Sequence, residues 1–437
     1  KDDSRLTDED TVIYADTSMC EGVSKKEAHD RFKKNLYLKL QGDTGKNLPW
    51  GYLTGVRPSK IAYSMLETGN SDEEIMSEFE EKHFVSHDKA ELAMQVAKTE
   101  KKILEDIDYT NGYSIYIGIP FCPTTCLYCS FTSYSLAANR SKVDLYLDAL
   151  VKEMRFVADR MKGRRLDTVY FGGGTPTTLE PEQLDRLLNE LEADFDMSTV
   201  KELTVEAGRP DSVTVQKLEV LKKHGVDRIS INPQTMNDKT LEIIGRRHSA
   251  TQVEEAFKLA RSVGFDNINM DIILGLPGEG INELRYTLDK IKELKPESLT
   301  VHSLAIKRAA ALNIWREKYE DLKFENSDET VSLAQKYAGD IGCMPYYMYR
   351  QKNMAGNLEN VGYSVPGKEC IYNILIMEEK QTIIAMGAGA STKAVFDADQ
   401  PNPRIERVEN VKDLTSYISR IDEMIERKRL FFDNNML

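Results

Sequence analysis

Residues 117–131 read IGIPFCPTTCLYCSF, and this stretch holds three of the six cysteines of the chain, Cys122, Cys126 and Cys129. Their spacing is C-x3-C-x2-C. The stretch begins inside an apolar run at 113–119 that is rich in β-branched and aromatic residues and predicts a strand. Clustered thiols in a chain with so few cysteines are typical of a metal site and not of a disulfide framework. The sequence therefore places a candidate metal site directly after a strand.

From this loop to residue 305 the sequence alternates between short apolar runs and amphipathic helical stretches. Strands are expected at 113–119, 167–173, 201–207, 228–233, 267–277 and 297–305. Helices are expected between them at 144–161, 181–195, 212–225, 251–264 and 281–294. This order predicts a parallel sheet with crossover helices. Six units are too few to close an eightfold barrel, so the expected fold is an α/β (β/α)6 partial TIM barrel, with its chemistry at the carboxyl ends of the strands.

Two regions of different character flank the expected barrel. Residues 1–110 are expected to form a helix-rich N-terminal accessory region. Residues 111–306 are expected to form the barrel core, and residues 307–437 a mixed C-terminal domain with several tyrosine- and glycine-rich segments. The chain is thus expected to contain one catalytic core and two additional regions.

The overall charge and hydropathy exclude two classes of function. The 437 residues carry a formal net charge of −13, which repels nucleic acid at long range. No run approaches the roughly 18 consecutive apolar residues that a membrane-spanning helix needs. We therefore expect a cytoplasmic protein that spans no membrane and binds no nucleic acid.

Three clustered thiols suit a catalytic iron–sulfur cluster better than a zinc ion. A structural zinc site has four protein ligands, whereas a cluster held by three cysteines leaves one iron open. Two alternatives are a zinc site that recruits Cys343 or Cys370 as its fourth ligand, and three cysteines with no common role. The order of the motif resembles the signature of radical S-adenosylmethionine (SAM) enzymes. The resemblance implies that Cys122, Cys126 and Cys129 hold a 4Fe-4S cluster whose fourth iron binds SAM.

Other segments resemble the SAM-binding parts of the same superfamily. The motif FGGGTP at 171–176 ends the second expected strand, and glycines there let a ligand approach the backbone closely. Polar residues lie at or near the ends of the later strands. The resemblance implies SAM contacts from Tyr116, Gly172, Gly173, Gly174, Thr175, Glu206, Gln234, Arg246 and Asp271. By the same resemblance Tyr116 corresponds to a tyrosine near the SAM sulfonium and is the candidate catalytic residue.

The order of all these motifs is similar to that of the oxygen-independent coproporphyrinogen dehydrogenase (HemN-like) family, and of its HemZ branch in particular. That resemblance covers nearly the whole chain. It implies that two propionate side chains of coproporphyrinogen III, a tetrapyrrole, are converted to vinyl groups in porphyrin and haem biosynthesis. It also implies an electron donor of the flavodoxin or ferredoxin type. We expect a monomer.

Arginine side chains suit the binding of the propionate carboxylates, because the guanidinium group pairs with a carboxylate through two hydrogen bonds. Arg57, Arg209 and Arg350 are the candidates. For each of them an ordinary ion pair is the alternative.

Several positions depart from the patterns of the related branches. Phe131 stands where one branch has a further cysteine, and Gly118 stands where it has histidine. A sister branch of HemW-type haem chaperones also has phenylalanine at position 131, but its C-terminal His-Asn motif is Tyr372-Asn373 here. The alternative function is therefore haem binding or trafficking, or another radical reaction on a tetrapyrrole. Axial haem ligands would then be sought among Cys370, Tyr372 and His302.

Overall fold

The computed structural model describes residues 22–55, 57–305, 326–351, 358–400 and 403–435. The expected boundary between residues 306 and 307 lies outside these ranges, as does the segment 352–357 within the tyrosine-rich part of the C-terminal region. The statements below concern the described residues.

All six predicted strands are present and form the centre of one large sheet. They are β1 (Tyr113–Ile119), β4 (Leu166–Gly173), β5 (Glu202–Glu206), β6 (Arg228–Ser230), β7 (Ile268–Leu274) and β8 (Ser298–Ser303). These strands pair in parallel in that order. The predicted parallel (β/α)6 core is therefore confirmed, although β6 is shorter than the predicted run at 228–233.

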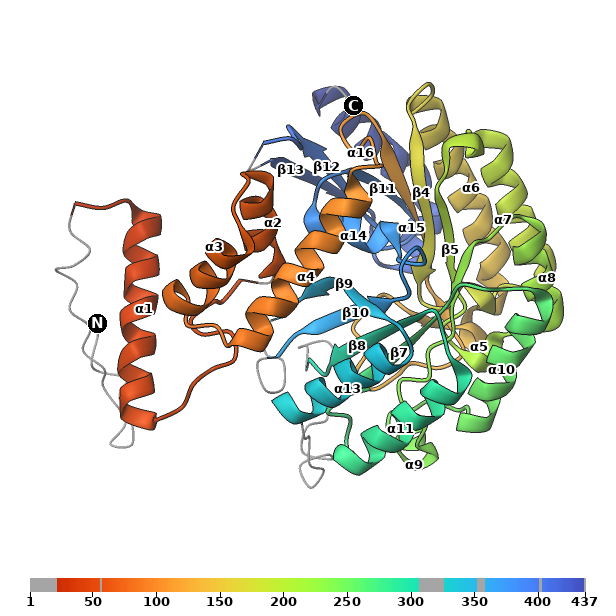
Figure 1. Cartoon of the computed structure of the whole chain (residues 1–437). Coiled ribbons are helices and arrows are strands. Elements are labelled where there is room, and N and C mark those ends of the chain that lie inside the picture. Colours follow the sequence, from red (N-terminus) through yellow and green to blue (C-terminus); the bar gives the residue numbers. More distant parts are fainter. Residues whose placement is uncertain (1–21, 56, 306–325, 352–357, 401–402, 436–437) are drawn as a thin grey trace, which may run out of the picture.

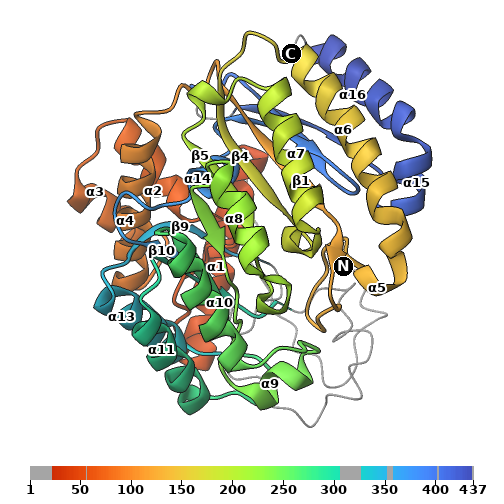
Figure 2. The same ribbon diagram turned by 90° about the vertical axis from the view of Figure 1, so that its right-hand side faces the viewer.

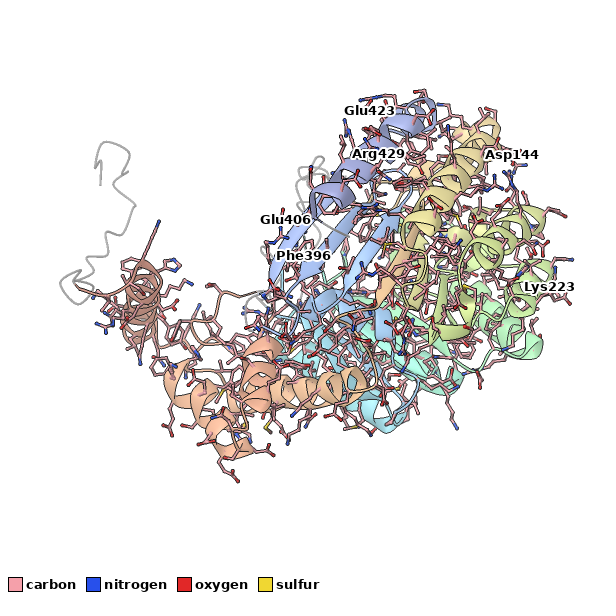
Figure 3. All side chains as sticks on the ribbon, turned by 90° about the horizontal axis from the view of Figure 1, so that it is seen from above. Asp144, Lys223, Phe396, Glu406, Glu423 and Arg429 are labelled. Carbon is pink, nitrogen blue, oxygen red and sulfur yellow. The ribbon has the colours of Figure 1, made fainter. Side chains whose placement is uncertain are left out.

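The crossover helices cover the outer face of this sheet (Figures 1 and 2). They are α6 (Val143–Arg160), α7 (Pro181–Asp194), α8 (Val215–Lys223), α10 (Ala250–Val263) and α11 (Ile281–Leu294). In α7 the buried residues Leu184, Leu187, Leu188 and Leu191 recur at helical spacing. The opposite helix faces carry charge. Asp144 of α6 and Lys223 of α8 lie on this outer surface (Figure 3).

Strands of the C-terminal region extend the sheet at both edges. At one edge β11 (Thr382–Met386) pairs in parallel with β1, and β12 (Ser391–Phe396) and β13 (Arg404–Glu409) follow in antiparallel pairing. At the other edge β10 (Asn360–Ser364) pairs antiparallel with β8 and with β9 (Met344–Tyr349). The sheet has eleven strands within the described ranges, so the C-terminal region shares a sheet with the barrel core.

The N-terminal region is helical, as predicted. It contains α1 (Lys25–Thr44), α2 (Ser59–Glu67), α3 (Asp72–Ser77), a π-helical turn (Glu78–Lys82) and α4 (His87–Leu104). Helix α4 packs against β9, whereas α1 lies at the far end of the molecule (Figure 1). A buried contact joins this region to the sheet, because Trp50 Nε1 donates to the Glu359 carboxylate at 2.7 Å.

The remaining elements surround the ends of the sheet. They are the short strands β2 (Phe121–Cys122) and β3 (Tyr134–Ser135) and the helices α5 (Leu136–Asn139), α9 (Asp238–Ile243), α13 (Asp328–Asp340), α14 (Ile371–Glu378), α15 (Leu414–Ser419) and α16 (Ile421–Asn435). Helix α14 packs against β4 and β9, on the face of the sheet opposite the crossover helices (Figure 1). None of the described helices is long and apolar enough to cross a membrane.

Candidate functional site

The three-cysteine loop lies at the carboxyl end of β1. Cys122 ends the short strand β2, which pairs with β3 and so anchors the start of the loop. The amide of Cys129 donates to the carbonyl of Cys126 at 3.1 Å, which makes a tight turn between these two thiols. The amide of Leu127 donates to the Ile244 carbonyl at 3.0 Å and ties the loop to the segment after α9.

All three cysteines line one cavity of about 390 Å³, a size within the usual range for small-molecule sites. Burial raises the pKa of the Cys122 thiol to about 11, so iron binding there displaces a proton. Within the described ranges no three His, Cys, Asp or Glu side chains lie close enough to share one metal ion. A 4Fe-4S cluster does not require such closeness, because its cysteine thiolates bind different iron atoms.

The glycine-rich turn after β4 packs against the base of the cysteine loop. Gly173 has φ of 107°, a conformation that strongly favours glycine. A Cβ atom on Gly174 would lie 2.6 Å from the carbonyl oxygen of Phe121. Gly173, Gly174 and Thr175 line the cavity, whereas Gly172 is not among its lining residues. The turn thus offers bare backbone to a ligand beside the thiols.

Acidic and polar side chains from successive strands line the same cavity. Glu206 is the last residue of β5, Asp271 lies in the middle of β7, and both face the cavity together with Arg246 from the loop after α9. Gln234 also lines it and has φ of 65°, a strained conformation for a residue other than glycine. The structure brings all four of these predicted residues together with the three cysteines.

The two acidic residues differ in their protonation. Burial raises the pKa of Glu206 to about 7, against the effect of a hydrogen bond at 2.6 Å from the Tyr170 hydroxyl, and the negative charge of Asp271 adds to the increase. For Asp271, burial also favours the neutral form, but hydrogen bonds from His302, Asn269 and Thr300 lower its pKa overall. The cavity therefore holds one firmly ionised carboxylate beside one that titrates near neutrality.

Tyr116 lies behind this cavity and not in its lining. Its ring stacks on Tyr170 and on Tyr372 of α14, with a centroid separation of 6.3 Å in each case. Tyr170 and Tyr372 stack more closely, at 4.5 Å. The three rings connect β1, β4 and α14. The Tyr170 hydroxyl also donates a hydrogen bond to the Glu206 carboxylate, which lines the cavity.

The three arginines proposed for carboxylate binding have partners within the protein. Arg57 donates to the Met377 carbonyl and pairs with Glu379 at 2.6 Å. Arg209 lines the cavity, and its guanidinium makes two hydrogen bonds to Asp211, at 2.9 and 2.7 Å.

Arg350 also has partners within the protein. It donates to the Leu53 carbonyl at 2.8 Å and lies over the Trp50 ring. Of the three, only Arg209 is a lining residue of the cavity.

The other candidate ligands lie in different places. Cys370 contacts the Glu202 carboxylate, and Cys343 contacts the Glu297 carbonyl. Glu202 begins β5 and Glu297 precedes β8, so both cysteines lie at the amino ends of the strands, away from the three-cysteine loop. Of the three haem-ligand candidates, only His302 lines the cavity.

Sequence reasoning missed three residues of the predicted strand at 228–233, of which Arg228 and Ser230 lie in β6 and Asn232 lies just after it. Arg228, Ser230 and Asn232 line the cavity, and each has a buried side-chain atom with no hydrogen-bond partner among the described residues. The signal was the alternation in RISIN at 228–232, where polar and isoleucine side chains point to opposite faces. We predicted the strand but did not assign roles to its inward side chains.

The unpartnered atoms allow the fit of the implied cofactor to be tested. Gln234 Oε1, Asn232 Oδ1 and Arg246 Nε are buried in the cavity wall with no partner among the described residues. Buried polar atoms are normally hydrogen-bonded, so the cavity is suited to a ligand that supplies both donors and acceptors. SAM has both kinds of group, and the adjacent thiols supply the cluster ligands. The residues present fit this cofactor pair.

Comparison with known proteins agrees with the cofactor pair that fits the cavity. Residues 116–291 match the radical SAM superfamily. The chain is 42% identical to the oxygen-independent coproporphyrinogen-III oxidase-like protein HemZ of Bacillus subtilis over 414 residues, which are 93% of this chain and 82% of that protein. It is 39% identical to the heme chaperone HemW of the same organism over 194 residues, 44% of this chain and 50% of HemW.

A solved structure is similar in fold. The coproporphyrinogen III oxidase HemN of Escherichia coli, described as a radical SAM enzyme, superposes with a TM-score of 0.57. The match covers 74% of this chain and 73% of that chain, at 22% sequence identity. At this identity the likeness concerns the fold.

Proposed function

The chain belongs to the radical SAM superfamily and, within it, to the HemN-like family, and on that premise we propose that it oxidatively decarboxylates coproporphyrinogen III to protoporphyrinogen IX without oxygen. Its cofactors are a 4Fe-4S cluster and SAM. In this reaction each of two propionate side chains loses one hydrogen atom, one electron and carbon dioxide and becomes a vinyl group. The reducing electron is proposed to come from a flavodoxin or ferredoxin, and the working protein is proposed to be a monomer.

The single observation that supports the proposal is the cavity itself. It brings Cys122, Cys126 and Cys129 together with acidic and amide side chains in and after the barrel strands. When bound, the cluster and SAM would supply the radical chemistry that removes a hydrogen atom from the propionate. The protein provides binding and orientation.

The residues around the cavity have distinct tasks in this proposal. The three cysteines would hold the cluster, while Gln234, Asn232 and Arg246 would use their unpartnered atoms to hold SAM. Asp271, kept ionised by its hydrogen bonds, would accept from the hydroxyl or amino groups of the cofactor. The bare backbone of the glycine turn allows close approach.

A haem chaperone is the second candidate function. HemW is similar to part of this chain, and Phe131, which follows the cysteine loop, is 69% exposed beside the cavity. An exposed aromatic ring could pack on a macrocycle in either function. The two candidates differ in whether the tetrapyrrole is changed or only carried.

The test is an anaerobic assay of the cluster-reconstituted protein with SAM, a strong reductant and coproporphyrinogen III. We expect 5'-deoxyadenosine and decarboxylated porphyrin products to increase together, as measured by mass spectrometry. A Cys126→Ala variant should lose both products and the visible absorption of the cluster. Cleavage of SAM with intact coproporphyrinogen would contradict the proposal, and a stoichiometric Soret band after haem addition would then favour the chaperone.

A further inference from the structure

The floor of the cavity contains a buried cation. Arg228 is the first residue of β6, at the end of the strand remote from the cysteine loop. It is only 2% exposed, yet it belongs to the cavity lining. Its Nε and Nη2 atoms have no hydrogen-bond partner, and no carboxylate lies within ion-pair distance of it, among the residues that the structure describes. A buried guanidinium without partners destabilises the folded protein unless a ligand supplies the hydrogen-bond acceptors.

Arg228 differs in this respect from the other buried or partly buried cations near the site. Arg209 is paired with Asp211, and Arg57 is paired with Glu379. Arg246 donates to the Asn232 carbonyl and lies beside Cys126, at the cofactor end of the cavity. At the other end of the cavity, Arg228 is therefore the cation whose N–H donors remain available to a ligand.

Two carboxyl groups are close enough to affect Arg228 electrostatically, but neither is its partner. Glu202 accepts from the amides of Ile371 and Tyr372, at 2.6 and 3.4 Å, and so is bound to the start of α14. Glu206 accepts from the Tyr170 hydroxyl at 2.6 Å and takes up a proton near neutral pH. Ionisable hydroxyl and thiol groups of Tyr170, Tyr346 and Cys370 also face Arg228 and remain neutral, because burial raises the pKa of each.

The surroundings of Arg228 add neutral polar groups and no competing cation among the lining residues of this end. Strand register places Arg228 beside Thr204, and Ser230 beside Glu206. The hydroxyls of Thr204 and Ser230 are buried without a partner among the described residues. Asn269 and Asn373 also line the cavity. A planar guanidinium with hydroxyl and amide groups nearby suits a carboxylate, which accepts several hydrogen bonds at once.

From this geometry we propose that Arg228 and Ser230 form a carboxylate-binding subsite at the floor of the cavity, which takes the propionate arm of the tetrapyrrole substrate. The identity of the arm rests on the proposed function, whereas the carboxylate chemistry rests on the buried guanidinium. The macrocycle then stays toward the mouth, and a single side arm enters between the strands. Arg228 becomes a substrate-binding residue in place of Arg57, Arg209 and Arg350.

Binding to the full-length protein tests this subsite without catalysis. The probe is coproporphyrin III, the stable oxidised form that retains four propionates, and its tetramethyl ester is the uncharged comparison. We expect Arg228→Gln to weaken binding of the acid about tenfold or more, with Arg228→Lys weakened less. Binding of the ester should be the same in the wild type and in Arg228→Gln.

A stability measurement separates a ligand-binding role from a structural one. Lys428 is a matched buried cation, 1% exposed, whose ammonium pairs with Glu153 and donates to the Ala385 carbonyl at 2.7 Å. Lys428→Met should lower the melting temperature of the ligand-free protein. Arg228→Gln should leave it unchanged or raise it, because an unpartnered buried charge is removed.

Two results would overturn the inference. They are unchanged binding of the acid by Arg228→Gln, and a fall in melting temperature like that of Lys428→Met. The decarboxylation assay is independent of both. If the wild type binds the acid through Arg228 but produces no vinyl product, the subsite stands and only the proposed reaction is wrong.

Discussion

Gly174 packs so closely against the cysteine loop that a methyl group has no room there. Its Cβ would lie 2.6 Å from the Phe121 carbonyl oxygen and 2.9 Å from that of Ile119, and both are backbone atoms that cannot rotate away. We expect Gly174→Ala to lower the free energy of unfolding by about 1–3 kcal/mol, as measured by urea titration. Gly42→Ala, with nothing within 4 Å of the added methyl, should be neutral or slightly stabilising. Equal stability of Gly174→Ala and the wild type would contradict this packing.

Glu206 should make stability depend on pH in a specific direction. Its pKa is raised to about 7 in the folded chain, from an ordinary value of 4.5, chiefly by burial. Between these values the folded state binds a proton that the unfolded state has released, so the free energy of unfolding falls as pH rises. Glu206→Gln has no carboxyl group to titrate, so the free energy of unfolding no longer falls with pH for this reason. We expect the variant to be more stable than the wild type by about 1–3 kcal/mol at pH 8 and nearly equal to it at pH 5.

Urea unfolding of the cofactor-free protein at the two pH values measures this difference. A constant difference between the variant and the wild type across this range would show that Glu206 keeps an ordinary pKa. In Glu206→Gln the Tyr170 hydroxyl can still donate to the amide oxygen of the new side chain, so the hydrogen bond itself is not removed.

At the scale of the element, α14 is held by opposite charges at its two ends. The Glu202 carboxylate accepts from amides at its first turn. At its last turn, Lys393 donates to the Ile376 carbonyl at 3.1 Å, and Arg57 donates to the Met377 carbonyl. This arrangement complements the helix dipole. It also fixes Tyr372 against the stacked tyrosines beside the cavity.

Removal of the Arg57 charge should loosen the end of α14. We expect Arg57→Gln to lower the free energy of unfolding by about 1–3 kcal/mol, because the partly buried Glu379 loses a partner. Amide hydrogen exchange in the last turn of α14 should accelerate about tenfold. Arg420→Gln, in an ion pair whose side chains are more than 40% exposed, is the control and should change stability by less than about 0.5 kcal/mol. Unchanged exchange in α14 would mean that Arg57 does not hold this helix.

Elements differed in how far the sequence could predict them. The six barrel strands and their helices have regular periodicity, so they were expected at nearly the observed positions. The strand β11, which lies between β1 and β12, was not predicted, although its residues are all buried. Its place beside β1 depends on pairing between residues about 270 positions apart, such as Tyr113 with Thr382. Such pairing has no local signal in one sequence.

At the scale of the whole molecule, a buried polar contact joins the N-terminal helices to the sheet. The Glu359 side chain is fully buried and accepts from Lys89 Nζ at 2.6 Å and from Trp50 Nε1 at 2.7 Å. Lys89→Met would leave this carboxylate without its counter-charge. We expect a loss of about 3–5 kcal/mol in the free energy of unfolding, measured by urea titration. The double variant Lys89→Met/Glu359→Gln should recover part of that loss.

An exposed ion pair provides the contrast for this prediction. Lys98 and Asp72 lie 2.5 Å apart, but both side chains are about half exposed. Lys98→Met should therefore cost less than about 1 kcal/mol. A similar loss for Lys98→Met and Lys89→Met would mean that burial is not what gives the Lys89–Glu359 contact its importance.

Local patterns in the chain were enough to predict the partial barrel and the three-cysteine loop, because periodicity and short spacings depend on neighbouring residues. The acidic residues Glu206 and Asp271 were expected only from the family resemblance. The arginine partners could not be predicted in this way. Arg57 meets Met377, and Arg350 meets Leu53, across about 300 residues of chain, while Nε and Nη2 of Arg228 meet no acceptor among the described residues. Only the folded arrangement decides which buried charges are paired, because a hydrogen bond depends on distance in space and not on separation along the chain.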